Sequence, residues 1–185
     1  MGNFIRYYDG ILSAEFCNEV IRRFEADDSS EPGRVHRSDG RAALDLQVKQ
    51  TTELVISARQ GWEDVEQELQ GKYIECVNRY AEEFPQIGEI GGQLSSEAFR
   101  IKKYAIGGFF NWHLDCTGDG FYRVLAIQFY FNRVDEGGET EFRFQDCKVQ
   151  AVPGRVVIFP TLWTYHHRGA TVISNPKYIC TNFVR

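Results

Sequence analysis

The stretch RVLAIQFYFNRVDEGGETEF, residues 123–142, decides the fold. A run of β-branched and aromatic residues leads into the turn at Gly137-Gly138, and a second short β-rich run follows the turn. Glycine supplies the unusual backbone angles of such a turn, so we assign Gly137-Gly138 a structural role. Many short strands at regular spacing predict a sandwich or barrel, and a jelly roll fits their number. The other β-rich runs are 97–106, 109–115, 148–152, 155–159 and 177–184.

The first half of the chain has a helical character. Ser13 can cap a helix whose apolar residues recur at helical spacing up to Phe24, and a second apolar stripe runs from Trp62 to Phe84. Residues 27–41 are polar and predict a long loop, which is either a functional lid or a plain surface loop. Helices first and strands later predict an α+β fold. We expect a single domain over 1–185, with helical support at about 1–96 and a jelly-roll core at about 97–185.

Composition limits the function. The chain of 185 residues has a formal net charge of −5, which argues weakly against a nucleic-acid partner. The five cysteines contain no CxxC pair, so free thiols in a reducing cytosol are the simplest interpretation. We find no signal peptide and no apolar run of membrane-spanning length. These features predict a cytoplasmic protein without a membrane partner, and they leave the oligomeric state open.

His113 and Asp115 form an H-x-D pair within a predicted strand. Residues two apart on a strand share a face, so both side chains can point at one metal ion. Alone the signal is weak, because a surface histidine near an aspartate is commoner than a metal site. A third ligand can come from His166 or His167, whereas His36 in the polar loop is more often solvated. Two histidines and one carboxylate are the ligand set of non-haem Fe(II) oxygenases.

Four blocks of sequence, in order, resemble the Fe(II)/2-oxoglutarate-dependent dioxygenases, and within them the prolyl 4-hydroxylase-like branch. The resemblance covers residues 99–184, and the N-terminal helices fit the same family more loosely. In that family a histidine precedes a lysine or arginine by ten residues, a spacing that selects His167 over His166 because of Lys177. The blocks are YAIGGFFNWHLD (104–115), RVLAIQFYFNRVDEGGETEF (123–142), GRVVIFP (154–160) and HRGATVISNPK (167–177).

The resemblance implies a site and a reaction. Fe(II) would be held by His113, Asp115 and His167. The enzyme would couple oxidative decarboxylation of 2-oxoglutarate by O2, giving succinate and CO2, to hydroxylation of a C–H bond, with ascorbate as a candidate reductant. Asp115 favours hydroxylation, because related halogenases lack this carboxylate. The residues implied for 2-oxoglutarate are Lys177, Tyr104, Thr181 and Tyr130, and those for the substrate entrance are Arg123 and Trp163.

Lys177 also has an argument of its own, since a lysine in an apolar strand needs an anionic partner when it is buried. Tyr130 is equally well explained as core packing, and Arg123 as a surface residue that opens a strand. The family favours a prolyl residue of a peptide or protein as substrate. A free amino acid or another small molecule is the rival, because Phe183 stands where prolyl hydroxylases often carry tryptophan.

Two further classes of protein compete with this interpretation. A cupin-like metal enzyme would gather similar ligands without 2-oxoglutarate, but it would leave Lys177 unexplained. A jelly-roll binding module without enzymatic activity would make the three ligands accidental. We also hypothesise that Arg34, Arg37 and Arg41 of the 27–41 loop fold over an anionic or peptide substrate.

Overall fold

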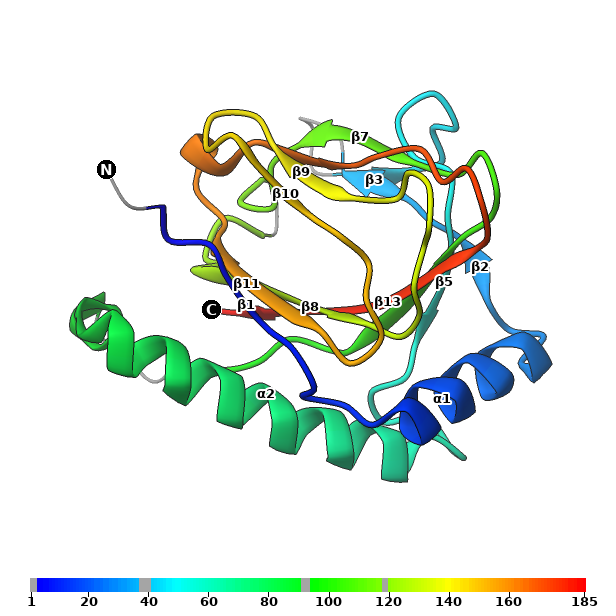
Figure 1. Ribbon diagram of the computed structural model, residues 1–185, viewed down its shortest axis with the longest axis horizontal. Helices are drawn as coiled ribbons and strands as arrows, with labels where there is room; N and C mark the ends of the chain where they lie inside the picture. The colour runs from blue at the N-terminus through cyan, green and yellow to red at the C-terminus, as the bar shows by residue number, and fades with distance from the viewer. Residues whose placement is uncertain (1–2, 37–40, 91–93, 118–119) are drawn as a thin grey trace.

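Two antiparallel sheets face each other, and two helices cover the outer side of the larger sheet (Figure 1). The computed structural model describes residues 3–36, 41–90, 94–117 and 120–185. The larger sheet has seven strands, in the spatial order β1 (Arg6–Tyr8), β11 (Val156–Pro160), β8 (Leu125–Tyr130), β13 (Lys177–Val184), β6 (Arg100–Tyr104), β5 (Thr52–Val55) and β2 (Glu31–Pro32).

The smaller sheet has four strands, in the order β10 (Cys147–Val149), β9 (Thr140–Phe142), β12 (His167–Gly169) and β7 (Phe110–His113). A separate two-stranded hairpin joins β3 (Val35–His36) and β4 (Ala42–Ala43). Short 3₁₀ turns follow the second helix at Pro85–Ile90 and precede β12 at Trp163–Tyr165. This arrangement confirms the predicted α+β fold with a jelly-roll core.

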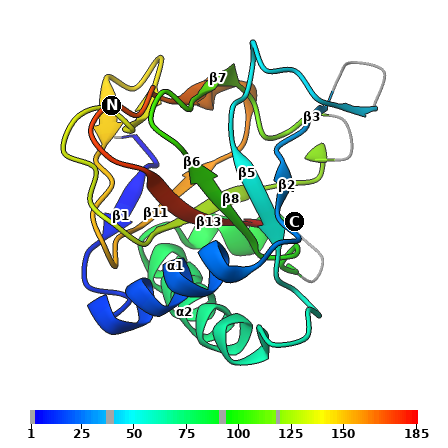
Figure 2. The ribbon, with the colours of Figure 1, turned by 90° about the vertical axis from the view of Figure 1, so that its right-hand side faces the viewer.

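The two helices begin and end where local sequence dictates. Helix α1 (Ala14–Ala26) starts at Ser13, whose hydroxyl accepts a hydrogen bond of 3.1 Å from the backbone N–H of Phe16. Helix α2 (Glu63–Glu83) follows Trp62 and ends before Pro85, which cannot continue a helical hydrogen-bond ladder. Figure 2 shows both helices packed beneath the sheet that contains β8, β13 and β6.

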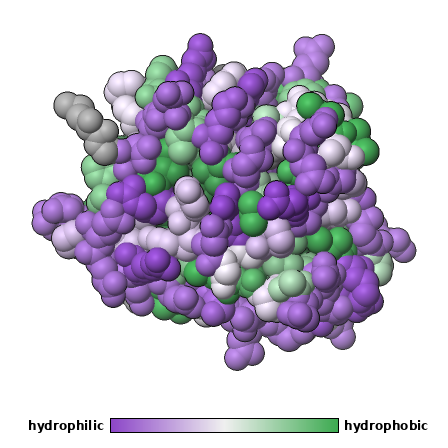
Figure 3. All heavy atoms as spheres, viewed as in Figure 1, coloured by the Kyte–Doolittle hydropathy of each residue, from purple (hydrophilic) through white to green (hydrophobic). Residues whose placement is uncertain are grey.

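The larger sheet separates two hydrophobic cores. Strand β8 is buried along its whole length. Its side chains alternate between the two faces of the sheet, and both faces are covered. Ile127 and Phe129 pack toward the helices, whereas Ala126 and Tyr130 pack into the space between the sheets. The face of the molecule seen in Figure 3 is mostly hydrophilic, with apolar side chains in interrupted patches. One face of the larger sheet therefore packs against the helices, and its other face is available to line a functional site.

The N-terminal region differs from the prediction, because it is not only helical. Strands β1, β5 and β2 come from it and join the larger sheet, so the expected division near residue 96 does not separate two structural layers. These strands have two to four residues, too few for a clear periodic signal. The predicted 27–41 loop contains β2 and β3, and its residues 37–40 lie outside the described residues.

Candidate metal and cosubstrate site

Three potential metal ligands converge at one end of the smaller sheet. His113 is the last residue of β7, and His167, the first residue of β12, lies directly across from it. Asp115 lies just beyond β7 rather than within it, so a bend and not strand alternation brings its carboxylate to the histidines. The candidate ligand atoms of all three residues lie within 4.8 Å of one another.

Backbone contacts fix both imidazole rings. The Nδ1 atom of His113 lies 2.8 Å from the carbonyl oxygen of Asn111, and Nδ1 of His167 lies 3.0 Å from that of Tyr165. A proton on each Nδ1 would donate to these carbonyls and leave the Nε2 lone pairs free for a metal. The two Nε2 atoms lie 3.7 Å and 3.4 Å from the Asp115 carboxylate, on the side where a cation would sit.

Burial keeps the first histidine neutral. Desolvation and the neighbouring His167 lower the pKa of His113 well below its usual value. Its ring also stacks on Phe110, with ring centroids 3.5 Å apart, and this contact limits rotation of the imidazole. Neutral imidazole is the form that binds metals. The donor set of two imidazole nitrogens and one carboxylate, with no thiolate, therefore fits Fe(II).

A small cavity of ≈ 30 Å³ continues from these three residues into the sandwich. Lys177 lines it from β13, is 1% exposed, and donates a hydrogen bond of 2.7 Å to the carbonyl oxygen of Gly138. Burial lowers the pKa of Lys177 to about 7. Its side chain therefore occupies the interior, and the sequence expectation of a buried lysine on this strand is met.

Two of the other residues implied for 2-oxoglutarate, Tyr104 and Thr181, line the same cavity, and Tyr130 lies behind it. Tyr104 lies across from Lys177 in the β6–β13 register, and the lysine Nζ lies 4.8 Å from the tyrosine ring centroid. Thr181 lines the cavity from the same strand as Lys177. The Tyr130 hydroxyl lies 2.8 Å from Oγ1 of Thr140, which also accepts a hydrogen bond from Gln128. Tyr130 is thus held in a buried polar network behind the cavity: Thr140 and Gln128 line the cavity, whereas Tyr130 itself does not.

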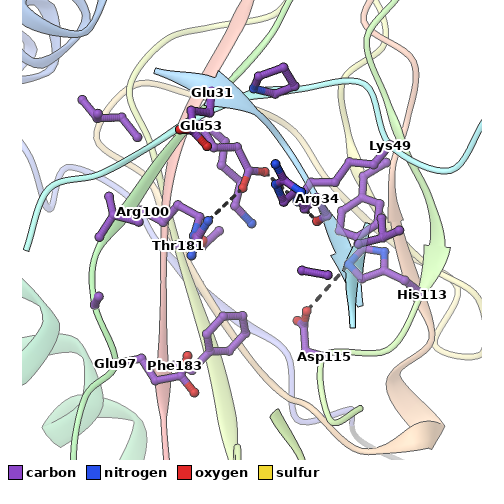
Figure 4. A pocket seen from close by; sticks show the side chains of 18 of the residues that line it. Glu31, Arg34, Lys49, Glu53, Glu97, Arg100, His113, Asp115, Thr181 and Phe183 are labelled. Carbon is purple, nitrogen blue, oxygen red and sulfur yellow. Dashed lines mark hydrogen bonds and ion pairs between the residues drawn. The ribbon is translucent and has the colours of Figure 1, made fainter. Parts of the chain in front are cut away.

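A larger cleft of ≈ 950 Å³ opens from the metal ligands toward solvent (Figure 4). His113, Asp115, Thr181 and Phe183 form its inner end, while β2, β3 and the start of β4 contribute to its outer rim. Arg34 lines the cleft, whereas Arg37 lies outside the described residues. Part of the predicted loop therefore borders the route to the metal ligands.

The two residues expected at the substrate entrance have different positions. Arg123 lines the cleft, forms a two-armed ion pair with Glu97 at 2.7–2.8 Å and stacks over the ring of Phe183. Trp163 is 71% exposed and is not among the described residues that line the cleft or the small cavity. His166 points away from the metal ligands toward Trp112, although it reaches the cleft wall.

Sequence reasoning missed a buried charged cluster beside the metal ligands. Lys49 and Glu53 form an ion pair of 2.6 Å with side chains only 6% and 5% exposed, and Arg100 lies 3.3 Å from the same carboxylate. Lys102 lines both the cleft and the cavity. Burial alone would raise the pKa of Glu53, but these cations outweigh it and lower that pKa to about 2. The alternation of Arg100, Lys102 and Tyr104 was the available signal.

Comparison with known proteins agrees with this geometry. Residues 99–185 match the model of the 2OG-Fe(II) oxygenase superfamily. No protein of established annotation matches the chain. Among solved structures, a viral collagen prolyl hydroxylase from Paramecium Bursaria Chlorella virus-1, with 2-oxoglutarate bound, is 20% identical with a TM-score of 0.69, covering 100% of this chain and 96% of that one.

Two further solved structures share the fold. A Pseudomonas putida prolyl-4-hydroxylase is 17% identical with a TM-score of 0.69, covering 99% of this chain and 92% of that one. A prolyl hydroxylase from Trichoplax adhaerens, in complex with a peptide fragment of the hypoxia inducible factor oxygen degradation domain, is 13% identical with a TM-score of 0.75. That match covers 98% of this chain and 83% of the other.

The fold and the three converging candidate ligands fit a non-haem iron oxygenase. Residues 99–185 match the 2OG-Fe(II) oxygenase superfamily, which supports an Fe(II)- and 2-oxoglutarate-dependent dioxygenase, and the chain has a prolyl-hydroxylase-like fold. No helix among the described residues is both long and apolar enough to cross a membrane.

Proposed function

We propose that His113, Asp115 and His167 hold Fe(II), and that Lys177 binds the distal carboxylate of 2-oxoglutarate. The convergence of the three ligand atoms at the mouth of a cavity that ends in a buried lysine carries this assignment. Tyr104 and Thr181 add hydroxyl groups on the way to that lysine. The proposed site lies within one domain that spans residues 1–185, because strands from both halves of the chain build the sheet beneath it.

Iron with 2-oxoglutarate and O2 supplies the oxidising power for C–H hydroxylation, with loss of CO2 and formation of succinate. The protein residues position the partners. The carbonyls of Asn111 and Tyr165 hold the two imidazoles in one tautomer, and Phe110 and Phe159 keep water away from them. Lys177 would hold the far carboxylate of 2-oxoglutarate through its positive charge.

A prolyl residue of a peptide is our first candidate for the substrate. The fold matches three prolyl hydroxylases, and the cleft that leads to the metal ligands is large enough for a short peptide segment. Arg123 and Glu97 form its wall beside Phe183, where the ring offers an apolar surface to a pyrrolidine. Mass spectrometry of proline-containing peptides after incubation with Fe(II), 2-oxoglutarate and O2 would detect the addition of one oxygen atom.

A free amino acid or another small molecule is the second candidate. The cationic residues at the inner end of the cleft favour it, because a buried positive charge requires an anion that a neutral prolyl side chain does not carry. The same incubations with single amino acids in place of peptides would compare the two candidates directly.

An anaerobic titration with Fe(II) and 2-oxoglutarate tests the cofactor assignment. We expect a visible metal-to-ligand charge-transfer band in the wild type and in His166→Ala. His167→Ala should lose the band because a metal ligand is missing, and Lys177→Ala should need more 2-oxoglutarate to develop it. His166→Ala is the matched control, since it removes the adjacent imidazole that faces Trp112. A folded wild type without a band would refute the assignment.

A further inference from the structure

A lysine that the proposed metal and cosubstrate assignments leave unused lies between the inner cavity and the cleft. Lys102 is 9% exposed and lines both spaces, together with His113 and Asp115. Within the described part of the chain its ammonium group has no hydrogen bond or close ion pair, only the longer-range attraction of Glu53 and Asp115. A buried cation without a direct partner is costly, so it indicates a missing anion.

The strand alternation directs Lys102 into the site. Arg100, Lys102 and Tyr104 occupy every second position of β6, so they share the face toward the space between the sheets. Lys103 points to the opposite face, where its ammonium lies 2.8 Å from Glu25 of α1. The inward row runs from the cleft, lined by Arg100, to the cavity, lined by Tyr104, and Lys102 lies between them.

The carboxylate on the strand opposite Lys102 already has other partners. Glu53 lies across from it in the β5–β6 register, but its oxygens contact Lys49 at 2.6 Å and Arg100 at 3.3 Å (Figure 4). Thr51 donates a further hydrogen bond to it at 2.9 Å. Glu53 therefore faces three cationic side chains, Lys49, Arg100 and Lys102, and its one charge cannot neutralise all of them.

We infer that Lys102 binds a carboxylate group of the substrate and thereby presents a carbon close to that carboxylate for hydroxylation. This inference rests on the proposed function, since it places the reacting carbon beside His113 and Asp115. The proposed distal carboxylate site of 2-oxoglutarate is already supplied by Lys177 on another strand. Burial lowers the pKa of Lys102 only to about 8, so the side chain is mainly cationic at neutral pH.

The carboxylate can come from two sources with the same chemistry. A free amino acid or a peptide with a C-terminal residue in the site presents an α-carboxylate. A peptide that continues on both sides presents the side chain of an aspartate or glutamate next to the hydroxylated residue. Because the fold resembles that of prolyl hydroxylases, the probes of both kinds contain proline. Each carboxylate probe is paired with its carboxamide.

The experiment measures probe binding by calorimetry on the full chain, both metal-free and with Fe(II) and 2-oxoglutarate under anaerobic conditions. The probes are L-proline with L-prolinamide, glycyl-L-proline with glycyl-L-prolinamide, and blocked peptides containing Asp-Pro or Asn-Pro. The variants are Lys102→Met and the matched control Lys103→Met, which removes the neighbouring lysine from the outer face. Circular dichroism verifies that each variant is folded.

In the wild type and in Lys103→Met we expect at least one carboxylate probe to bind roughly tenfold or more tightly than its amide. Lys102→Met should abolish that difference. Preference for the first two pairs identifies an α-carboxylate, and preference for Asp-Pro identifies an acidic side chain. Equal binding of acid and amide, no binding of any carboxylate at millimolar concentration, or discrimination that survives Lys102→Met would overturn the inference.

The charge-transfer titration separates this inference from the proposed function. A wild type that discriminates acid from amide but shows no band supports the carboxylate site and refutes the oxygenase assignment. A wild type that shows the charge-transfer band but binds acid and amide equally supports the oxygenase assignment and refutes the carboxylate site. A Lys102→Met variant that discriminates normally but needs tenfold more 2-oxoglutarate would assign Lys102 to the cosubstrate, and the inference would be wrong.

Discussion

At 1% exposure, the Lys177 ammonium depends on what the cavity contains. Among the described residues it donates one hydrogen bond, to the Gly138 carbonyl, and the nearby rings of Tyr104 and Tyr130 offer only weak attraction to a cation. Burial therefore lowers the pKa of Lys177 to about 7, and an arriving carboxylate would raise it again. Binding of a dicarboxylate to this cavity should consequently take up a proton above neutral pH.

This linkage predicts a pH dependence of 2-oxoglutarate affinity. As the pH rises above about 7, the free lysine is increasingly neutral, so the affinity should fall by up to roughly tenfold per pH unit. Charge-transfer titrations from about pH 6 to about pH 9 would measure the dissociation constant. Lys177→Arg is the control, because a guanidinium stays charged over this range. A flat wild-type profile would contradict the assignment of Lys177.

Sequence alone identified the chemistry of single residues better than their surroundings. The H-x-D pair is a local pattern, and the family resemblance supplied the spacing to Lys177 that selects His167; together they pointed to the three residues that converge. Lys102 was missed, because its role depends on Glu53, on a neighbouring strand, already forming an ion pair with Lys49. No local pattern reveals how ion pairs are shared between strands.

At the scale of elements, strands within a β-rich run of sequence were predictable, including the short β7 and β9, whereas β12 and β2 were not. The eight-residue strand β13 and the apolar strand β8 were found because their composition is unmistakable. Strand β12 has three residues, one of them His167, and β2 has two, so neither shows a periodic pattern. Both are held by pairing with neighbours, which tertiary structure alone reveals.

The ion pair between Lys49 and β5 gives a test of stability. Among the described residues, Lys49→Met would leave Glu53 with close contacts to Arg100 and Thr51 and the longer-range attraction of Lys102, and breaking a buried ion pair costs about 3–5 kcal/mol. We expect chemical denaturation to show a loss of unfolding free energy near the lower end of that range. The pKa of Glu53 is lowered to about 2, so the pair should stabilise the wild type above the ordinary glutamate pKa and lose that contribution as pH falls toward about 2.

Two further variants make this result specific. Lys148→Met removes the exposed partner of Glu141 and should cost much less stability than Lys49→Met, because solvent screens an exposed ion pair. The double variant Lys49→Met/Glu53→Leu also removes the carboxylate that faces Arg100 and Lys102, so any further loss of stability measures what Glu53 contributes to those two cations. If the single variant were as stable as the wild type, the buried pair would have no net role in folding.

At the scale of the whole molecule, the family match covers less than the folding unit. Residues 99–185 contain the proposed ligands, but β1 and β5 from the first half pair with β11 and β6. Helix α2 contributes Leu69 and Cys76 to the core that buries Ile127 and Phe129. Without the first half, the outer face of the larger sheet would be exposed to water.

We therefore expect a fragment of residues 97–185 to lack a cooperative fold. Exposed apolar surface and unpaired strand edges favour aggregation over a native state. Thermal denaturation and amide dispersion in NMR spectra would compare the fragment with the full chain. A fragment that unfolds cooperatively would show that the helices and N-terminal strands are accessory, and it would contradict our single-domain assignment.

The position of β13 has a consequence for biosynthesis. This strand follows every other described element along the chain, yet it pairs with β8 on one side and β6 on the other. The ribosome synthesises residues 177–184 after β6 and β8, so the edges of both strands that later pair with β13 remain unpaired until then. Because Lys177, Thr181 and Phe183 arrive on the same strand, the walls of the site are completed in the step that closes the sheet. The larger sheet and the binding cavity are therefore completed in the same folding step.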